Sequence, residues 1–214
     1  MNVIDLTQTI SEDMSVFPGT EKPKLTPANS YEADGFKETL FTMFSHTGTH
    51  MDPPVHLFAG KTTLDRFPAG QFVGKAVVVD CRGVKAGGRI GMACLDRDRA
   101  RVDAADFILF NTGWSRFWGT DEYLGDFPLI SEEVARYLIG AKKKGLGVDV
   151  ISIDPIADDD LTIHKLIFSS AETVIIENLT NLEHCGKELF TFICLPLKWK
   201  NADGAPARAI ALLE

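Results

Sequence analysis

The sequence of 214 residues has no long uninterrupted apolar segment and no concentration of positive charge. A membrane-spanning helix needs about 20 consecutive apolar residues, and phosphate backbones are bound by clustered Lys and Arg side chains. The run Lys142-Lys-Lys144 is too short to offset a net charge of −8. Residues 1–7 also lack the basic start and apolar stretch of a leader peptide. We therefore expect a cytoplasmic protein whose partners include neither nucleic acid nor a membrane.

The sequence contains few cysteines, and their spacing matches no metal-binding or redox motif. The four cysteines form no CxxC pair, and each lies in or beside an apolar, strand-like stretch: Cys81, Cys94, Cys185 and Cys194. We interpret them as reduced thiols rather than as a zinc ribbon or a disulfide framework. His184 precedes Cys185, but neighbours in sequence rarely form a nucleophile and its base. We expect His184, in a polar loop, to be an ordinary surface residue.

The hydrophobic content of 45% is enough for one well-buried core, and the length is short for two domains. We expect one domain over residues 1–214, since no repeat, low-complexity tract or linker interrupts the chain. Short apolar runs rich in β-branched residues predict buried strands at 76–80, 107–110, 148–153, 173–176 and 189–194.

One helix is clearly indicated between the second and third of these strands. Ser131 is a typical N-cap, Glu132 and Glu133 favour the first turn, and apolar residues from Val134 onward share one face. Three lysines and Gly145 then favour its end. A strand, a helix and another strand predict an α/β sheet, while two shorter connections favour antiparallel pairs. The fold class is therefore α/β with a mixed sheet.

The histidines are concentrated in one short segment. Only five occur in the chain, and three fall within eleven residues, in the run His46-Thr-Gly-Thr-His50-Met-Asp52-Pro-Pro-Val-His56. The glycine, the β-branched threonines and the proline pair all disfavour a helix here. In an extended segment side chains alternate, so His46, His50 and Asp52 would point the same way. Two imidazoles and a carboxylate would then converge.

This combination suits a divalent metal ion such as zinc, with manganese or iron as alternatives, and a carboxylate can bridge two ions. Gly48 leaves space between the ligands, and Thr47 or Thr49 could hold them by hydrogen bonds. The proline pair turns the chain and redirects His56, which would be suited to proton transfer. The alternative is a set of structural histidines lining a turn.

The second half of the chain offers two more candidates. His164 follows an acidic segment, and Glu177 closes the predicted strand at 173–176, where a carboxylate would face the usual site edge of an α/β sheet. Taken alone, such a histidine is more often a core residue, and such a glutamate is more often solvated.

The histidine run resembles the signature of the cyclase-like metal hydrolases, the family that includes bacterial kynurenine formamidase and isatin hydrolase. The resemblance covers nearly the whole chain. It extends to the opening Ile4-Asp-Leu-Thr, the turn Phe17-Pro-Gly, the segment Asn111-Thr-Gly-Trp114, the stretches around His164 and Glu177, and the ending Pro196 to Arg208.

The resemblance implies a metal group and a separate acid/base. One metal would be bound by His46, His50 and Asp52, and Asp52 would bridge to a second metal held with His164 and Glu177. His56 would be the general acid/base. The implied cofactor is one or two Zn²⁺ ions, or Mn²⁺, and the implied fold is a swivelling β/β/α domain that forms a homodimer or a larger homo-oligomer.

The resemblance also implies the reaction, which is hydrolysis of the amide bond of a small aryl amide such as N-formyl-L-kynurenine. Metal-activated water would attack the carbonyl while His56 takes and returns a proton. The alternatives are a cyclic amide such as isatin, or a metal- or ligand-binding protein without turnover. Formamidases of this family place Trp before the Pro-Gly turn, where this chain has Phe17, which stacks but lacks the indole N–H. The candidates for an aromatic pocket are Phe17, Phe41, Phe44 and Trp114.

Overall fold

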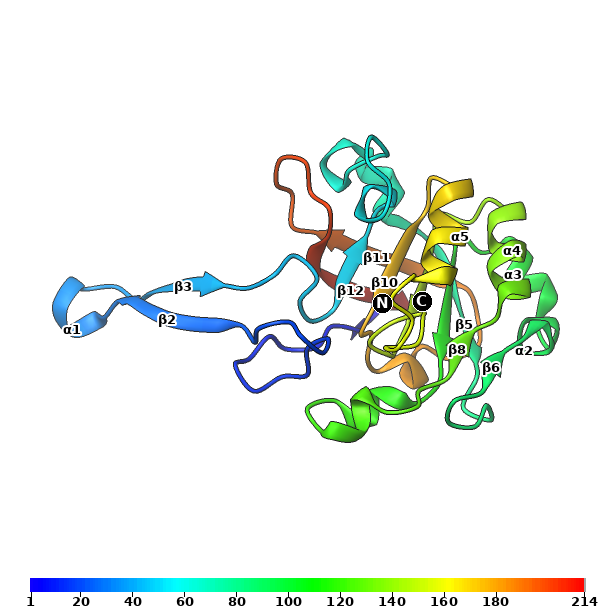
Figure 1. The fold of residues 1–214 in the computed structure, drawn as a ribbon, viewed down its shortest axis with the longest axis horizontal. Coiled ribbons are helices and arrows are strands. Elements are labelled where there is room, and N and C mark those ends of the chain that lie inside the picture. Colours follow the sequence, from blue (N-terminus) through cyan, green and yellow to red (C-terminus); the bar gives the residue numbers. More distant parts are fainter. Residues whose placement is uncertain (214) are drawn as a thin grey trace.

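The computed structural model describes residues 1–213, whose central feature is a sheet that closes on itself (Figure 1). The strand order in this sheet is β1-β12-β11-β5-β7-β9-β10-β4, and β4 also pairs with β12. All strands of the sheet except β1 therefore belong to a closed ring. The strands are β1 (Asn2–Asp5), β4 (His50–Asp52), β5 (Val73–Asp80), β7 (Phe107–Asn111), β9 (Gly145–Val148), β10 (Val174–Glu177), β11 (Phe190–Pro196) and β12 (Ala205–Leu213).

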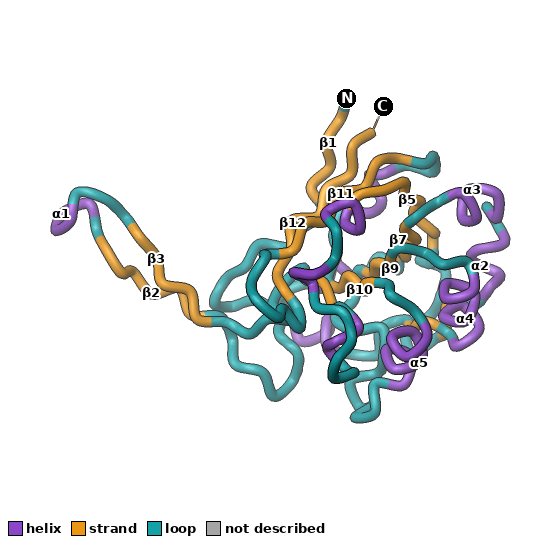
Figure 2. Tube along the Cα trace, turned by 90° about the horizontal axis from the view of Figure 1, so that it is seen from above, coloured by secondary structure: helices purple, strands orange, loops and turns teal. Residues whose placement is uncertain are grey.

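The sheet is mixed, as expected from the sequence. The neighbours β5, β7, β9 and β10 run parallel, and the other pairs are antiparallel. The α-helices lie along one side of the parallel strands (Figure 2): α2 (Met92–Asp96), α3 (Arg99–Ala104), α4 (Glu132–Gly140) and α5 (Thr162–Ser170). Two further strands, β6 (Arg89–Ile90) and β8 (Leu129–Ile130), form a small separate sheet. Short 3-10 helices occupy Pro54–His56, Leu64–Arg66, Ala69–Phe72, Trp114–Phe117, Asp121–Leu124 and Leu182–Cys185.

Alternation along the strands divides the buried side chains between two cores. On β7, Phe107 and Leu109 belong to the core inside the closed sheet, whereas Ile108 and Phe110 belong to the core between sheet and helices. Four successive inward positions of β12 are alanine, from Ala205 to Ala211, which leaves room for the inward phenylalanines of the neighbouring β11. A β layer therefore separates the interior of the ring from the helical layer.

Two glycines of β9 leave room for large neighbours. A Cβ atom at Gly145 would lie 2.9 Å from the Phe107 ring and 2.9 Å from the backbone oxygen of Val174. At Gly147 it would lie 2.6 Å from the Leu179 side chain. The strand can therefore pack closely only because these positions have no side chain.

The predicted helix is confirmed as α4, with one difference at its end. The Ser131 hydroxyl accepts a hydrogen bond from the backbone N–H of Val134 at 3.3 Å, as an N-cap does. The helix ends at Gly140, however, and Gly145 begins β9. The prediction that Gly145 ends the helix was therefore wrong, because close packing within the sheet, rather than capping, requires glycine there.

The predicted strand at 148–153 was also misplaced, since β9 ends at Val148. The next residue, Asp149, accepts hydrogen bonds from the backbone N–H groups of Thr112 (3.0 Å) and Trp114 (3.1 Å). Further on, the N–H of Ile153 donates to the Glu177 carboxylate at 3.0 Å. Buried carboxylates thus take the place of ladder partners, and the apolar run 149–153 is a buried loop rather than a strand.

A two-stranded arm extends from the body of the molecule (Figures 1 and 2). It consists of β2 (Lys24–Asn29) and β3 (Glu38–Thr42), joined through α1 (Tyr31–Asp34). Several of its large apolar side chains are more than half exposed, including Leu40 and Phe41. The arm therefore adds little to either core.

Two exclusions drawn from the sequence can be compared with the structure. Residues 1–213 contain no helix with the length and apolar character that a membrane crossing requires. All four cysteines are buried and free. Burial, with a contribution from the charge of Glu183, raises the pKa of Cys185 to about 12. A buried thiol with so high a pKa stays protonated at neutral pH, which argues against Cys185 as a nucleophile.

Replacement of glycine by alanine should change the stability in opposite directions at Gly145, which is closely packed in β9, and at Gly140, which is not. Gly145→Ala should lower the free energy of unfolding by about 1–3 kcal/mol, because the new methyl group meets a backbone oxygen that cannot move aside. Gly140→Ala, where nothing lies within 4 Å of the added Cβ, should raise it by about 0.4–1 kcal/mol. Urea unfolding of both variants measures this, and a destabilised Gly140→Ala would contradict the explanation.

Candidate metal centre

The register between β4 and β10 places the first two polar groups of the site. His50 pairs with Glu177, and Asp52 pairs with Ile175. Met51, between the two β4 residues, is fully buried in the core inside the closed sheet. Because neighbours on a strand point to opposite faces, His50 and Asp52 lie on the other face, toward α5.

Helix α5 supplies the next group, and Asp154 orients it. The Asp154 carboxylate accepts hydrogen bonds from the backbone N–H groups of Ile163 (2.8 Å) and His164 (2.9 Å), at the start of the helix. It also lies 2.8 Å from Nδ1 of His164. With Nδ1 engaged in this way, Nε2 of His164 faces Asp52 and Glu177.

Two imidazoles and two carboxylates alternate around one point. Nε2 of His50 lies 3.3 Å from Asp52 Oδ1 and 3.5 Å from Glu177 Oε2. Nε2 of His164 lies 3.6 Å from Asp52 Oδ2 and 3.3 Å from Glu177 Oε1. Two atoms that each bind one zinc ion at about 2.0–2.2 Å are at most about 4.4 Å apart. The donor set and its spacing therefore fit a divalent metal ion.

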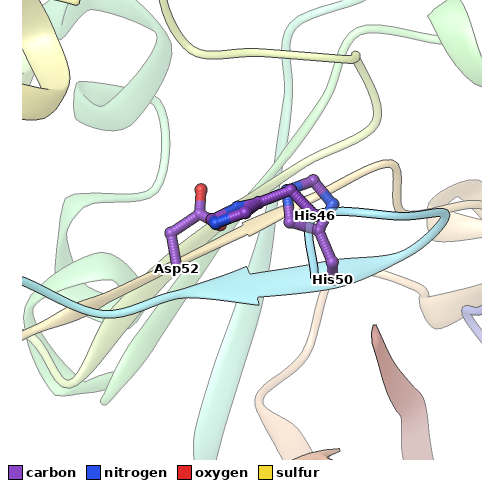
Figure 3. A group of neighbouring side chains, drawn as sticks. All are labelled: His46, His50 and Asp52. Atoms are coloured by element: carbon purple, nitrogen blue, oxygen red, sulfur yellow. The ribbon is translucent and has the colours of Figure 1, made fainter. Parts of the chain in front are cut away.

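His46 joins this group from the segment before β4 (Figure 3). Its Nδ1 lies 2.6 Å from Asp52 Oδ1. The segment is not regularly extended as expected, because Gly48 has a φ of +66° and turns the chain, and β4 begins only at His50. The convergence expected of His46, His50 and Asp52 thus arises from a turn followed by a three-residue strand.

The groups that hold the imidazoles differ from those expected. Thr47 and Thr49 donate their hydroxyls to the backbone oxygens of Phe44 and Asn178 (each 2.7 Å) and not to a candidate ligand. The Gly48 carbonyl instead lies 2.9 Å from Nδ1 of His50. Gly48 therefore contributes its backbone turn and its carbonyl rather than empty space between ligands.

Burial and charge together set the protonation of the group. Burial opposes protonation of His50, but the carboxylates of Asp52 and Glu177 outweigh it and raise the pKa of His50 to about 9. Burial likewise opposes protonation of His164, yet its hydrogen bonds to Asp154, Asp52 and Glu177 hold its pKa well above the usual value. The pKa of Asp52 stays well below its usual value because the charges of His50 and His46 outweigh burial. A metal ion must therefore displace protons from these imidazoles.

His56 lies beside the group but is not part of either set of converging donor atoms. It ends the short 3-10 helix Pro54–His56, and its ring centroid lies 4.1 Å from that of His46 and 6.4 Å from that of His164. Burial lowers the pKa of His56 to about 4, and the neighbouring imidazoles add to this effect against the opposing charge of Asp52. His56 is thus neutral at pH 7.

A cavity of about 390 Å³ opens over these residues, and its lining includes all six polar candidates from the sequence: His46, His50, Asp52, His56, His164 and Glu177. Phe17 and Phe44 also line it, whereas Phe41 and Trp114 do not. Trp114 donates its indole N–H to the backbone oxygen of Tyr123 at 3.1 Å, and Phe41 lies on the arm. The expected aromatic lining is thus reduced to two phenylalanines.

Sequence reasoning missed Asp154, Asn178 and Asp203. Asp203 lines the cavity, and the amide of Asn178 donates to the Gly48 carbonyl at 2.8 Å. Asp154 has no local sequence signal, because the N-cap position of α5 is Leu161 and Asp154 reaches the helix only through the path of the preceding loop. Asn178 and Asp203 have no distinguishing pattern, because their partners come from distant parts of the chain.

A family model named "Cyclase", described as "Putative cyclase", matches residues 4–155. The matched range covers more than half of the chain and contains β4 and His56. The chain belongs to the cyclase family. A curated relative of this cyclase-family protein is the kynurenine formamidase of Bacillus thuringiensis (strain Al Hakam), which is 30% identical over 97% of this chain and 95% of the relative.

Solved structures agree with this family assignment. Isatin hydrolase A from Ralstonia solanacearum has a TM-score of 0.86 and 26% identity, covering 100% of this chain and 92% of that one. A protein described as a predicted metal-dependent hydrolase from Bacillus stearothermophilus has a TM-score of 0.78 and 29% identity, covering 98% and 97%. The expected cyclase-like α/β fold is thereby confirmed.

The orientation of His164 predicts that Asp154 controls metal affinity. Asp154→Asn replaces one of two accepting oxygens by a donor, so it should weaken metal binding about 10- to 100-fold. The matched control is Asp158→Asn in the same loop, because the Asp158 carboxylate accepts its hydrogen bonds from Asp160 and Thr162 and none from His164. Metal titration of both folded variants measures this, and equal affinities would argue against the role of Asp154.

The raised pKa of His50 predicts opposite pH trends for stability and metal affinity. The folded pKa of about 9 lies above the ordinary 6.5, so the stabilisation from protonated His50 is complete below pH 6.5 and is lost as the pH rises through about 9. Chelator-treated protein should lose stability across this interval, while affinity for Zn²⁺ should increase. Thermal unfolding of the chelator-treated protein across this pH interval measures the stability. Calorimetric titration with Zn²⁺ over the same interval, in buffers of different ionisation enthalpy, measures the affinity. Affinity that stays constant over the interval would contradict the assignment.

Proposed function

We propose that this protein is a metal-dependent amide hydrolase that cleaves the C–N bond of a small aryl formamide. The observation that supports the proposal most is the combination, in one cavity, of a metal-compatible donor group with a histidine outside it. A metal-binding module without turnover needs only the donors. The added neutral His56 favours an enzyme.

The proposed ligands are His46, His50, Asp52, His164 and Glu177. Imidazole nitrogen and carboxylate oxygen are the donors that zinc prefers, and manganese accepts the same set. Asp52 directs one oxygen to each imidazole of the pair His50 and His164, and Glu177 does the same. These side chains would hold one or two such ions. When bound, such an ion polarises a carbonyl and lowers the pKa of a coordinated water towards about 7.

His56 would carry the proton during the reaction. Water adds to the formyl carbon, the C–N bond breaks, and the products are formate and an aryl amine. His56, neutral at pH 7 because its pKa is lowered to about 4, would accept the proton of the attacking water and pass it to the departing nitrogen. Such transfer typically contributes about 10²- to 10⁴-fold in rate.

The cavity volume of about 390 Å³ lies in the range of small-molecule sites. Phe17 and Phe44 would stack against an aromatic ring at the mouth, while the buried donor group lies at the base. N-formyl-L-kynurenine has the required aryl formamide, and the curated relative from Bacillus thuringiensis supports it. The similarity to isatin hydrolase A supports a second candidate, the ring amide of isatin, at the same site.

The test pairs metal analysis with two histidine variants. Purified protein should contain a divalent metal and hydrolyse N-formyl-L-kynurenine or isatin, which are assayed in parallel. His56→Ala should lower kcat by about 10²-fold or more with unchanged metal content. His184→Ala is the matched control, because His184 is an exposed histidine outside the cavity, and it should keep full activity.

Different outcomes reject different parts of the proposal. Loss of metal from His56→Ala would make His56 a ligand instead of a proton carrier. Full activity in Asp52→Ala would reject the whole metal centre. Metal-loaded protein that hydrolyses isatin alone would replace the aryl formamide by the cyclic amide as the substrate.

A further inference from the structure

The cavity wall is acidic and lacks a fixed cationic side chain. Among the described residues that line it, none is lysine or arginine. Its carboxylates are Asp52 and Glu177, which belong to the proposed metal group, and Asp203, which does not. One divalent ion would balance the charge of the first two. Asp203 would remain as a negative charge on the wall facing the substrate.

Asp203 is held in place by its neighbours in the loop between β11 and β12. The backbone N–H of Ala202 donates to Asp65 at 3.3 Å, and its carbonyl accepts from Leu64 at 3.1 Å. On the other side, Gly204 packs so closely on the His46 ring that any Cβ would clash with it. The carboxylate of Asp203 is therefore presented by a fixed loop, although its side chain is half exposed.

The carboxylate is only partly satisfied by the protein. Its Oδ2 accepts a hydrogen bond from the Ser45 hydroxyl at 3.3 Å and lies 4.0 Å from Nε2 of His46, too far for a hydrogen bond. Within residues 1–213, Oδ1 accepts no hydrogen bond from any neighbour. A carboxylate accepts several hydrogen bonds, so Asp203 has capacity for a donor that enters the cavity.

We propose that Asp203 is a specificity-determining residue that binds a primary ammonium group on the side chain of the aryl substrate. The inference rests on the proposed function and adds the charge of the substrate. An ammonium group offers three donors and the complementary charge. An anionic group at the same place would meet Asp203 with no lysine or arginine on the wall to balance it.

The distances suit one small substrate that spans both places. Nδ1 of His46 contacts Asp52 at 2.6 Å, and Nε2 of the same ring lies 4.0 Å from Asp203. The His46 ring therefore lies between the metal group and Asp203, and the 4.0 Å between that ring and the Asp203 carboxylate is the remaining separation. An aryl formamide with an aminoalkanoyl side chain beside the formamide carries its reacting carbon and its ammonium group at a comparable separation.

The experiment compares ligands that differ only in the amino group. Equilibrium binding of kynurenine and of its des-amino analogue to metal-loaded protein is measured by calorimetry, alongside hydrolysis of the two N-formyl derivatives. Asp203→Asn should weaken kynurenine binding, and raise KM for N-formylkynurenine, by about 5-fold, which corresponds to the upper limit of about 1 kcal/mol for a partly exposed ion pair. The des-amino compounds should change less than about twofold, as expected when the ion pair alone is lost.

Two further variants separate the ion pair from other effects. Asp203→Glu keeps the charge and should retain part of the preference for the amine. Asp13→Asn removes an equal charge from a residue outside the cavity lining, two positions before the lining residue Ser15, and it should leave the preference unchanged. If both ligands weaken equally in Asp203→Asn, or if metal content falls, Asp203 acts by orienting His46, and the proposal is wrong.

The binding measurement also separates this inference from the proposed function. In one outcome, metal-loaded protein prefers the amine ligand through Asp203 but hydrolyses neither formamide. This result would support the ammonium site and contradict the aryl formamide reaction. Hydrolysis of both formamides with no preference for the amine would keep the reaction and reject the site.

Discussion

The pairing of β4 with β10 is the constraint on which the site depends. It places His50 opposite Glu177 and sends Met51 into the core of the closed sheet. A slip of one residue would exchange these faces, burying Asp52 in an apolar core and presenting a methionine to α5. The three-residue strand is held against such a slip because β12 pairs with its other edge. The strand pairs that close the sheet are thus the same pairs that bring the candidate metal ligands together.

The same pairing explains why buried charge is tolerated in this place. Two carboxylates and two imidazoles alternate, so each charge has an opposite neighbour, and the backbone of the loop after β9 supplies further donors. A buried ion pair stabilises a protein only when such partners satisfy its remaining hydrogen-bonding capacity. The irregular path of residues 149–154 is therefore part of the centre.

The local features of the fold could be read from the sequence, and the long-range ones could not. Helix α4 follows from Ser131 and the pattern after it, and the density of histidines around His50 indicates where a metal group could form. The turn at Gly48 could not be predicted, because its partners His50 and Asn178 are fixed by the closed sheet. Asp154 was missed for the same reason, since its role depends on where α5 lies relative to β4.

The arm has a consequence for how members of such a family can diverge. It lies between Phe17 and Phe44 in the chain, so the two aromatic walls of the cavity are encoded by the segments that flank one protruding hairpin. The metal group depends instead on β4 with the turn before it, on β10 and on α5. Insertions, deletions or substitutions in residues 17–44 can therefore reshape what the cavity admits while the reactive centre keeps its register. The aromatic walls of the cavity and the metal group therefore come from different segments of one domain.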